Sequence, residues 1–167
     1  MTGGATPPGP PSAPWLTDDQ QELATVILGS HQRGFGGPLL AGIQPEHSSL
    51  QQAQALFAAP RVVLAHDGRS DPHLIYANAQ ALGLWRRPWA DMVGLASRLT
   101  AEPQERPGRA QMLAEARSRQ AIRGYSGIRV DSNGRRFQLR GARLWTLRDR
   151  HGQAIGQAAS FSDWWWL

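Results

Sequence analysis

Hydrophobic residues in the first third of the chain recur at the spacing of one helical face. An apolar stripe over about 18–30 predicts a helix, and Thr17 stands where an N-cap is expected. The glycine-rich stretch 34–42 interrupts this pattern, and a second stripe over 46–58 predicts another helix. We therefore expect two helices before the first strand.

From residue 61 the pattern changes to short apolar runs that are typical of strands. The runs 61–66 and 73–77 flank a cluster of turn-forming residues, which predicts a β-hairpin. Asn78 follows the second run directly and is a favourable cap for a short apolar helix that ends near Trp85. The middle of the chain is therefore predicted to be a hairpin followed by a helix.

The last third of the chain predicts one longer helix and three antiparallel strands. The helix is expected over 107–122, and the strands over 125–130, 136–147 and 153–161. The Asn-Gly pair at 133–134 is a strong hairpin signal between the first two of these strands. The order of elements predicts an α+β fold with a PAS-like five-stranded antiparallel sheet, helices on one face and an N-terminal helical extension.

Composition divides the chain into three parts and indicates a folded protein. The Gly/Pro-rich segment 1–14 is predicted to be a disordered tail, 15–60 the helical extension and 61–167 the PAS-like domain. Hydrophobic residues make up 41% of the chain and charged residues 19%, which suits a globular domain. The sequence has no cysteine, which excludes disulfides, thiolate-bound metals and any cysteinyl photoadduct.

The positive charge of the chain does not indicate a nucleic-acid binder. All 18 cationic side chains are arginine and the net charge is +5, but the arginines are spread over 33–150 without a long run. Nucleic-acid binders usually concentrate such charge in one stripe. The sequence also has neither an apolar run long enough for a membrane span nor a secretory signal. We expect a cytoplasmic protein that binds neither nucleic acid nor membranes.

Four segments carry a resemblance to a known family. They are 75–85 (IYANAQALGLW), 97–103 (SRLTAEP), 125–137 (YSGIRVDSNGRRF) and 156–164 (GQAASFSDW). Together they resemble the MEKHLA domain, a PAS-like group. Plants append this domain to homeodomain–leucine zipper transcription factors, and bacteria have it as short stand-alone proteins. The chain shows neither a homeodomain nor a zipper, so it resembles the stand-alone bacterial form.

The resemblance implies a sensory or ligand-binding module that signals through an unidentified partner protein, and it implies no particular ligand. PAS folds line a cavity beneath their helices, where the segment 97–103 is expected. Arg98 is a candidate to bind a carboxylate there, with Thr100 and Glu102 orienting it. In the alternative reading Thr100 and Glu102 cap a helix and Arg98 pairs with a nearby glutamate.

Aromatic and polar residues complete the candidate cavity. A buried tyrosine hydroxyl or indole N–H requires a partner, which a ligand can supply, although the same residues would equally serve as core. Gln157 is the polar residue of the last predicted strand that we expect to face the cavity. The full set of candidate ligand-binding residues is Tyr76, Trp85, Arg98, Thr100, Glu102, Tyr125 and Gln157.

Alternation along the strand 125–130 separates two sets of side chains. Ser126, Ile128 and Val130 share one face, which we assign to the interior because it carries the apolar residues. Tyr125, Gly127 and Arg129 share the opposite face. On this assignment Arg129 and Arg136 are expected to be neighbours on the outer face of the sheet.

The C-terminal residues Trp164, Trp165 and Trp166 form a candidate dimer interface. Three consecutive tryptophans cannot all face one core, so at least one is exposed unless something covers it. We expect a homodimer that buries this end together with 15–28. The alternative is packing against the chain's own sheet.

The sequence offers no convincing catalytic or metal-binding motif. The five histidines lack metal-ligand spacing, and the expected helix 107–122 contains none. No serine stands in a nucleophile elbow. We expect a protein that is not an enzyme and has neither cofactor nor metal. A ligand-free interaction protein and a small enzyme on a curved sheet remain the alternative functions.

Overall fold

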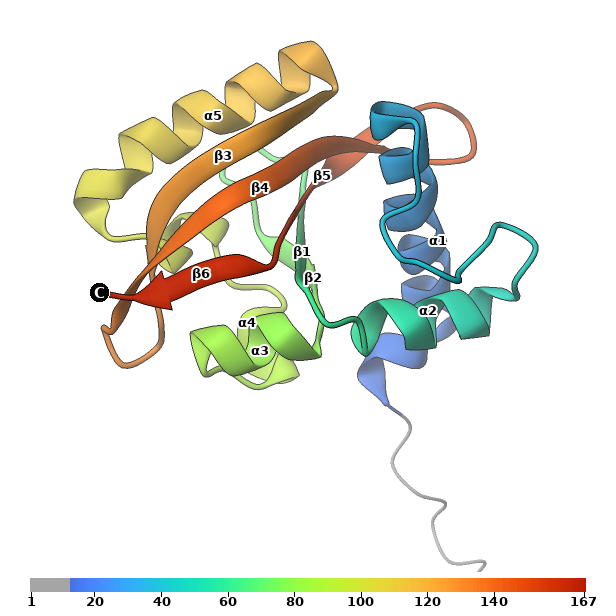
Figure 1. Ribbon diagram of the computed structural model, residues 1–167, viewed down its shortest axis with the longest axis horizontal. Coiled ribbons are helices and arrows are strands. Elements are labelled where there is room, and N and C mark those ends of the chain that lie inside the picture. Colours follow the sequence, from blue (N-terminus) through green and yellow to red (C-terminus); the bar gives the residue numbers. More distant parts are fainter. Residues whose placement is uncertain (1–12) are drawn as a thin grey trace, which may run out of the picture.

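Six strands form one antiparallel sheet at the centre of the computed structural model, which describes residues 13–167 (Figure 1). The strands are β1 (Val62–Asp67), β2 (Leu74–Ala77), β3 (Ala121–Val130), β4 (Arg136–Arg148), β5 (Ala154–Phe161) and β6 (Asp163–Trp166). Their order across the sheet is β2-β1-β5-β4-β3, and β6 pairs with β4. The five predicted strands are confirmed, and β6 is a sixth that the pattern did not predict.

Strand β6 continues the line of β5 along β4. The pairing of Arg143 with Ser160 is followed in the same register by the pairing of Arg140 with Asp163. The chain therefore leaves β5 at Phe161 and resumes pairing with the same neighbour after a break of one residue. This extension brings the C-terminal tryptophans to the sheet.

Helices surround the sheet, and their bounds follow the predicted order. They are α1 (Asp18–Phe35), α2 (Ser49–Phe57), α3 (Ala79–Trp85), α4 (Trp89–Met92) and α5 (Arg106–Arg119), with the 3-10 turns η1 (Pro14–Leu16), η2 (Ser97–Thr100) and η3 (Pro103–Glu105). The predicted cap Thr17 accepts a hydrogen bond from the Gln20 amide at 3.3 Å. Helix α1 ends at Phe35, and its C-cap Gly36 has a φ of 71°, which only glycine adopts easily.

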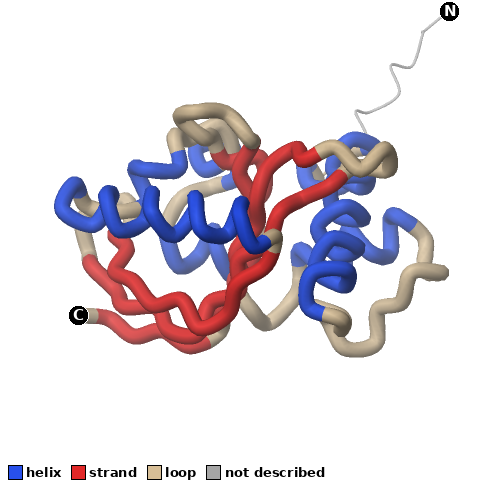
Figure 2. The backbone as a smooth tube through the Cα atoms, turned by 90° about the horizontal axis from the view of Figure 1, so that it is seen from above, coloured by secondary structure: helices blue, strands red, loops and turns tan. Residues whose placement is uncertain are grey.

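Alternate residues of each strand supply two separate cores. On β1, Val62 and Leu64 face the side covered by α3 and α5, which we call the inner face, whereas Val63 and Ala65 face α1 and α2. Figure 2 shows the strands running between α5 and the α1–α2 pair. The helical extension thus covers the sheet face that the PAS-like helices leave open.

The N-terminal extension is fastened to its own sheet. The Trp145 indole N–H donates to the Ile27 carbonyl at 3.1 Å, and the Arg148 amide donates to the Ser30 hydroxyl at 3.0 Å. Trp15 stacks on Phe57 with ring centroids 3.7 Å apart. The prediction that 15–28 forms a dimer interface is therefore wrong for its apolar face, which the same chain buries. Of the predicted tail, 1–12 lies outside the described residues.

Candidate functional site

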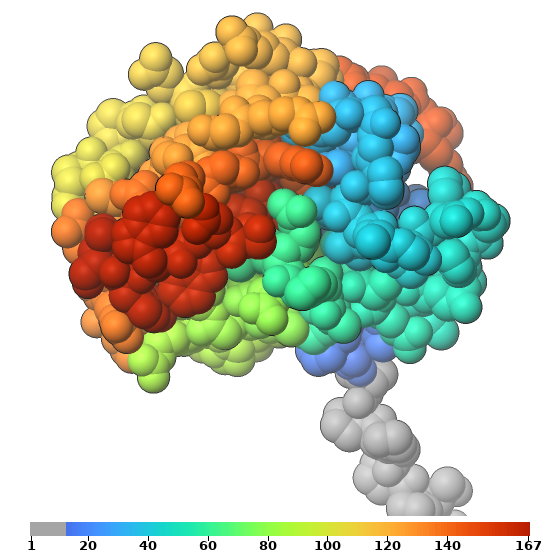
Figure 3. All heavy atoms as spheres, viewed as in Figure 1, coloured from blue at the N-terminus to red at the C-terminus, as the bar shows by residue number. Residues whose placement is uncertain are grey.

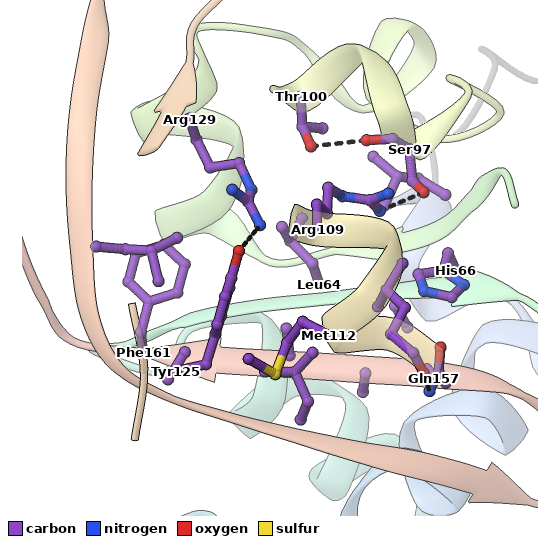
Figure 4. A pocket seen from close by; sticks show the side chains of 18 of the residues that line it. Leu64, His66, Ser97, Thr100, Arg109, Met112, Tyr125, Arg129, Gln157 and Phe161 are labelled. Carbon is purple, nitrogen blue, oxygen red and sulfur yellow. Dashed lines mark hydrogen bonds between the residues drawn. The ribbon is translucent and has the colours of Figure 1, made fainter. Parts of the chain in front are cut away.

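A cavity lies between the inner face of the sheet and α5, with the turn η2 at its rim (Figure 4). Its volume is about 60 Å³, several times the roughly 10–15 Å³ that one buried water needs. Apolar side chains of the sheet form most of its wall: Leu64, Leu74, Leu139, Ala142, Leu144, Ala159 and Phe161. The cavity is therefore larger than one water molecule requires, and most of its wall is apolar.

Two polar side chains of β3 reach into this cavity together. Arg129 Nη2 donates to the Tyr125 hydroxyl at 2.7 Å, and Arg129 Nη1 donates to the Ile128 carbonyl at 2.8 Å. Gly127 lies between them on the same face, and a Cβ there would stand 2.5 Å from the Tyr125 hydroxyl oxygen. A glycine at this position therefore gives the tyrosine and the arginine the room to meet.

This arrangement corrects the predicted faces of β3. Tyr125 and Arg129 point inward, whereas Ser126 is exposed. The pairing of β3 with β4 shifts register between Ile122 and Tyr125 and again between Tyr125 and Gly127. Such irregularities change which alternate residues face the core. Alternation counted from the apolar residues alone therefore gave the wrong inner face.

Helix α5 contributes a second arginine to the cavity. Arg109 Nη2 donates to the Ser97 hydroxyl at 2.6 Å, which ties the helix to η2. Burial, together with the nearby charge of Arg129, lowers the pKa of Arg109 to about 10, so its side chain remains cationic at neutral pH. Within the described part of the chain, no carboxylate oxygen lies within 4.0 Å of either guanidinium. The two cations thus share a largely apolar space without a counter-ion from the protein.

Two hydrogen-bond acceptors stand on the other side of the cavity, where Figure 4 shows His66 and Gln157. His66 Nδ1 lies 2.7 Å from the Asp67 carbonyl, which can only accept, so Nδ1 carries the proton and Nε2 is a bare acceptor. Gln157 Nε2 donates to the Leu113 carbonyl at 2.9 Å, and its Oε1 remains free. His66 Nε2 and Gln157 Oε1 are buried, and neither finds a partner among residues 13–167. Burial also lowers the pKa of His66, which keeps the ring neutral.

Four of the seven predicted site residues line the cavity. They are Trp85, Thr100, Tyr125 and Gln157. The Trp85 indole N–H is buried and has no partner among the described residues, whereas the Thr100 hydroxyl donates to the Ser97 carbonyl at 2.7 Å. Trp85 therefore offers a free donor, while Thr100 holds the rim.

The structure places the other three predicted residues outside the cavity. Arg98 is half exposed and pairs with Asp71 at 3.2 Å, and Glu102 forms an ion pair with Arg136. The alternative interpretation of this segment is met only in that Arg98 forms a surface ion pair, because its partner is Asp71 instead of a glutamate and the Glu102 side chain caps no helix. Arg136 lies outside the cavity, where it pairs with Glu102. Arg129 was expected to be its neighbour on the outer face, but it points into the cavity. Tyr76 belongs to the opposite core, where its ring contacts Trp89 edge-on at 5.8 Å.

Three lining residues that matter, Arg109, Arg129 and His66, were missed, although the sequence carries a signal for each of them. Arg109 stands three and four residues before Met112 and Leu113, so it shares the apolar face of its helix. Arg129 shares a strand face with Tyr125, and Gly127 lies between them. A glycine between two large polar residues indicates room for their side chains, as in a cavity wall. His66 follows Val62 and Leu64 at the spacing of one strand face, and β1 pairs with β5 in regular register, so alternation along β1 is the signal for its inward orientation.

The three C-terminal tryptophans divide between the core and the surface. Trp164 and Trp166 contact Phe137 edge-on at centroid distances of 6.0 and 5.8 Å, so both pack against the chain's own sheet. Trp165 points the other way and is 43% exposed. The deep red surface in Figure 3 shows the C-terminal strand uncovered on that face.

Two further observations concern metals and membranes. Residues 13–167 bring together no group of three histidine, aspartate or glutamate side chains that could hold a metal ion. None of the helices described here combines the length and the hydrophobicity needed to cross a membrane.

Known structures share this fold at low sequence identity. A PAS domain from Colwellia psychrerythraea matches with a TM-score of 0.59 and 13% identity, covering 66% of this chain and 91% of that one. A light-oxygen-voltage domain studied with a flavin analogue matches with a TM-score of 0.55 and 17% identity, covering 70% of this chain and 84% of the other. An RNA-binding light-oxygen-voltage receptor matches with a TM-score of 0.59 and 19% identity, covering 76% of this chain and 35% of the receptor.

These likenesses show a PAS fold. At such low sequence identity they do not identify a ligand for this chain. No curated protein matches the sequence. The model of the MEKHLA domain, however, matches residues 21–166, which include nearly all of α1, the whole of α2, the whole sheet and the cavity. The chain therefore belongs to the MEKHLA domain family.

Proposed function

We propose that this protein is a sensory module that binds a small molecule in the cavity beneath α5 and signals through contacts with another protein. The observation that carries the proposal is the set of buried polar groups that face the cavity without a partner. Leaving such a group unsatisfied costs roughly 1–3 kcal/mol, and more for a charged group. A bound molecule that meets these groups would recover that free energy.

Helix α5 is the element through which binding would be transmitted. It supplies Arg109, Met112 and Leu113 to the cavity wall, while the opposite wall belongs to the sheet. A ligand that contacts both walls would favour the arrangement in which α5 is docked on the sheet. The signal would then be a change in the population of docked α5 and in the surface it presents.

The first test is native mass spectrometry of the freshly purified protein, followed by denatured mass analysis of the same sample. A reproducible extra mass that is released on denaturation is the expected result. In Ala159→Leu, which fills the cavity from β5, we expect this mass to disappear. Ala110→Leu adds the same group on the exposed side of α5 and should retain it. Equal retention by both variants would overturn the proposed site.

We propose further that the partner is a second copy of the chain, bound through β6. The support is Trp165, a large exposed side chain on a strand that pairs only with β4 among the described strands. Light scattering after size-exclusion chromatography should give a dimer for the unaltered protein and a monomer for Trp165→Gln. The matched variant Leu50→Gln changes an exposed apolar residue of α2 and should remain dimeric. A monomeric unaltered protein would contradict the proposal.

A further inference from the structure

We propose that the ligand of this cavity is a small organic acid whose carboxylate binds between Arg109 and Arg129 and whose short apolar body ends in a hydroxyl group. This inference rests on the proposed function and adds the chemical class of the ligand. Three features of the cavity lead to it: its uncompensated positive charge, its carbon-lined wall and its two free acceptors.

The positive charge is the first feature. Two arginines that approach each other in a water-poor space repel, and burying them costs free energy unless an anion compensates. No aspartate or glutamate lines the cavity. Two acids adjoin the turn η2 and are engaged elsewhere, since Asp71 pairs with Arg98 and Glu102 pairs with Arg136. The compensating anion must therefore come from outside this part of the chain, and a guanidinium fork suits a carboxylate.

The remaining wall limits what else that anion can be. Inorganic phosphate would place charged oxygens on all sides and would need donors on all sides. Beyond the arginines, however, most of the wall is formed by carbon, including Leu64, Leu144 and Phe161. A group with one charged end and an apolar body matches this division between a cationic end and a hydrophobic end.

The far end of the body faces two acceptors. His66 Nε2 and Gln157 Oε1 both carry free lone pairs on the side of the cavity away from the Tyr125–Arg129 pair (Figure 4). A ligand hydroxyl can donate to one of them, whereas a carboxylate oxygen placed against His66 Nε2 or Gln157 Oε1 would meet another acceptor. The ligand is thus expected to be a monocarboxylate with a hydroxyl donor at the opposite end.

The probes for the test are chosen as matched pairs. 4-Hydroxybenzoate carries the carboxylate, the flat apolar body and the hydroxyl, and 5-hydroxypentanoate carries the same groups on an aliphatic body. 4-Hydroxybenzamide keeps the shape of the first probe without its charge, and inorganic phosphate tests charge alone. Binding is measured by isothermal titration calorimetry and by intrinsic tryptophan fluorescence, to which Trp85 in the cavity wall contributes. We expect at least one acid to bind and the amide to bind more than tenfold more weakly.

Variants assign the charge to particular residues. Arg109→Met and Arg129→Met should each weaken binding of the acid about tenfold to a hundredfold, because each removes charge-assisted hydrogen bonds. Arg129→Lys keeps the charge and should lose less than Arg129→Met. Arg119→Met, at the exposed end of α5, should bind like the unaltered protein. Circular dichroism confirms that each variant is folded before it is titrated.

The outcomes separate the ligand class from the proposed function. If Ala159→Leu abolishes binding while both methionine variants bind normally, the cavity is the site but the inference of an acid is wrong. If the amide or phosphate binds as tightly as the acids, or neither acid binds, the inference is likewise overturned. If Ala159→Leu also leaves binding unchanged, the proposed function fails together with it.

Discussion

At the scale of single residues, a few buried polar side chains join segments that are far apart in the sequence. Asn78 is fully buried, and its Oδ1 accepts from the amides of Val63 and Ala81 at 3.0 and 3.1 Å. Its Nδ2 donates to the Arg61 carbonyl at 2.7 Å. One amide group therefore caps α3 and fixes the start of β1, which is why a cap residue identified by sequence pattern is also a core residue.

Asn78→Ala tests this double role. We expect it to lower the free energy of unfolding by about 3 kcal/mol, since it removes a helix cap and leaves buried backbone groups unpaired. Urea denaturation followed by tryptophan fluorescence measures the loss. Gln80→Ala, on the exposed side of α3, should change stability by less than about 0.5 kcal/mol. A similar loss in both variants would contradict a specific role for the Asn78 side chain.

His31 makes stability depend on pH. It is buried, its Nδ1 lies 2.9 Å from the Gly37 carbonyl and its Nε2 lies 3.1 Å from Arg143 Nη1. Burial lowers its pKa from 6.5 to about 4, and the neighbouring charges of Arg143, Arg61 and Arg123 act in the same direction. The folded protein therefore holds His31 neutral at a pH where the unfolded chain has already bound a proton.

Stability should accordingly fall as the pH drops from about 6.5 to 4, by at most about 3 kcal/mol from His31. Urea titrations at stepwise pH measure the slope, and His31→Gln should flatten it. The neutral His66 acts in the same direction, so part of the slope remains. His151→Gln changes an exposed histidine of the β4–β5 turn and should keep the full slope. An unchanged slope in His31→Gln would contradict this assignment.

At the scale of elements, the junction of β1 and β5 depends on a close approach of two backbones. Gly156 pairs with Asp67, and a Cβ at position 156 would overlap the carbonyl oxygen of His66. The obstacle is backbone in the middle of a sheet, which cannot move aside as a side-chain end can. The absence of a side chain at position 156 therefore allows β5 to approach β1.

Gly156→Ala should therefore lower the free energy of unfolding by several kcal/mol, since the two central strands must separate or bend. Thermal and urea denaturation measure the loss. Gly83→Ala is the matched control, because a Cβ in α3 meets nothing within 4 Å. That control should raise stability by about 0.5–1 kcal/mol through helix propensity. Tolerance of Gly156→Ala would mean that β1 and β5 lie farther apart than described.

Elements were predicted better than their ends and better than the directions of their side chains. Caps and tight turns are local signals, so Thr17, Asn78 and the Asn-Gly turn at 133–134 were found. The end of α1 is set by the left-handed conformation of Gly36, one of several glycines in that stretch. Strand β6 pairs with β4 in the same register as β5 does. No local sequence pattern indicates this pairing, so β6 was not predicted.

The residues of the cavity were also predicted better than the directions of their side chains. Trp85, Thr100, Tyr125 and Gln157 were predicted from residue type and fold position. The inward direction of Arg129, in contrast, follows from a register shift between β3 and β4, a non-local feature.

At the scale of the whole molecule, the helices on the two faces of the sheet are bound to it in very different ways. Helix α1 buries Ala24, Ile27, Ser30 and His31 and is bonded to β4 by Trp145 and Arg148. Helix α5 buries only Leu113 and Ala116, and much of its contact with the sheet is the wall of the cavity. The extension and the sheet therefore form a rigid base, and α5 is the weakly held element that covers the site.

Hydrogen–deuterium exchange should show this asymmetry and its response to binding. Backbone amides of 106–119 are expected to exchange faster than those of 18–35, because local opening of α5 exposes few buried apolar groups. If 4-hydroxybenzoate binds as inferred, it should slow exchange in α5 and leave α1 unchanged, since it bridges Arg109 of the helix and Arg129 of the sheet. In Arg129→Met the same compound should give no protection to α5. Uniform protection of the whole chain would instead indicate stabilisation of the fold as one unit, and α5 would then not be the element that reports the ligand.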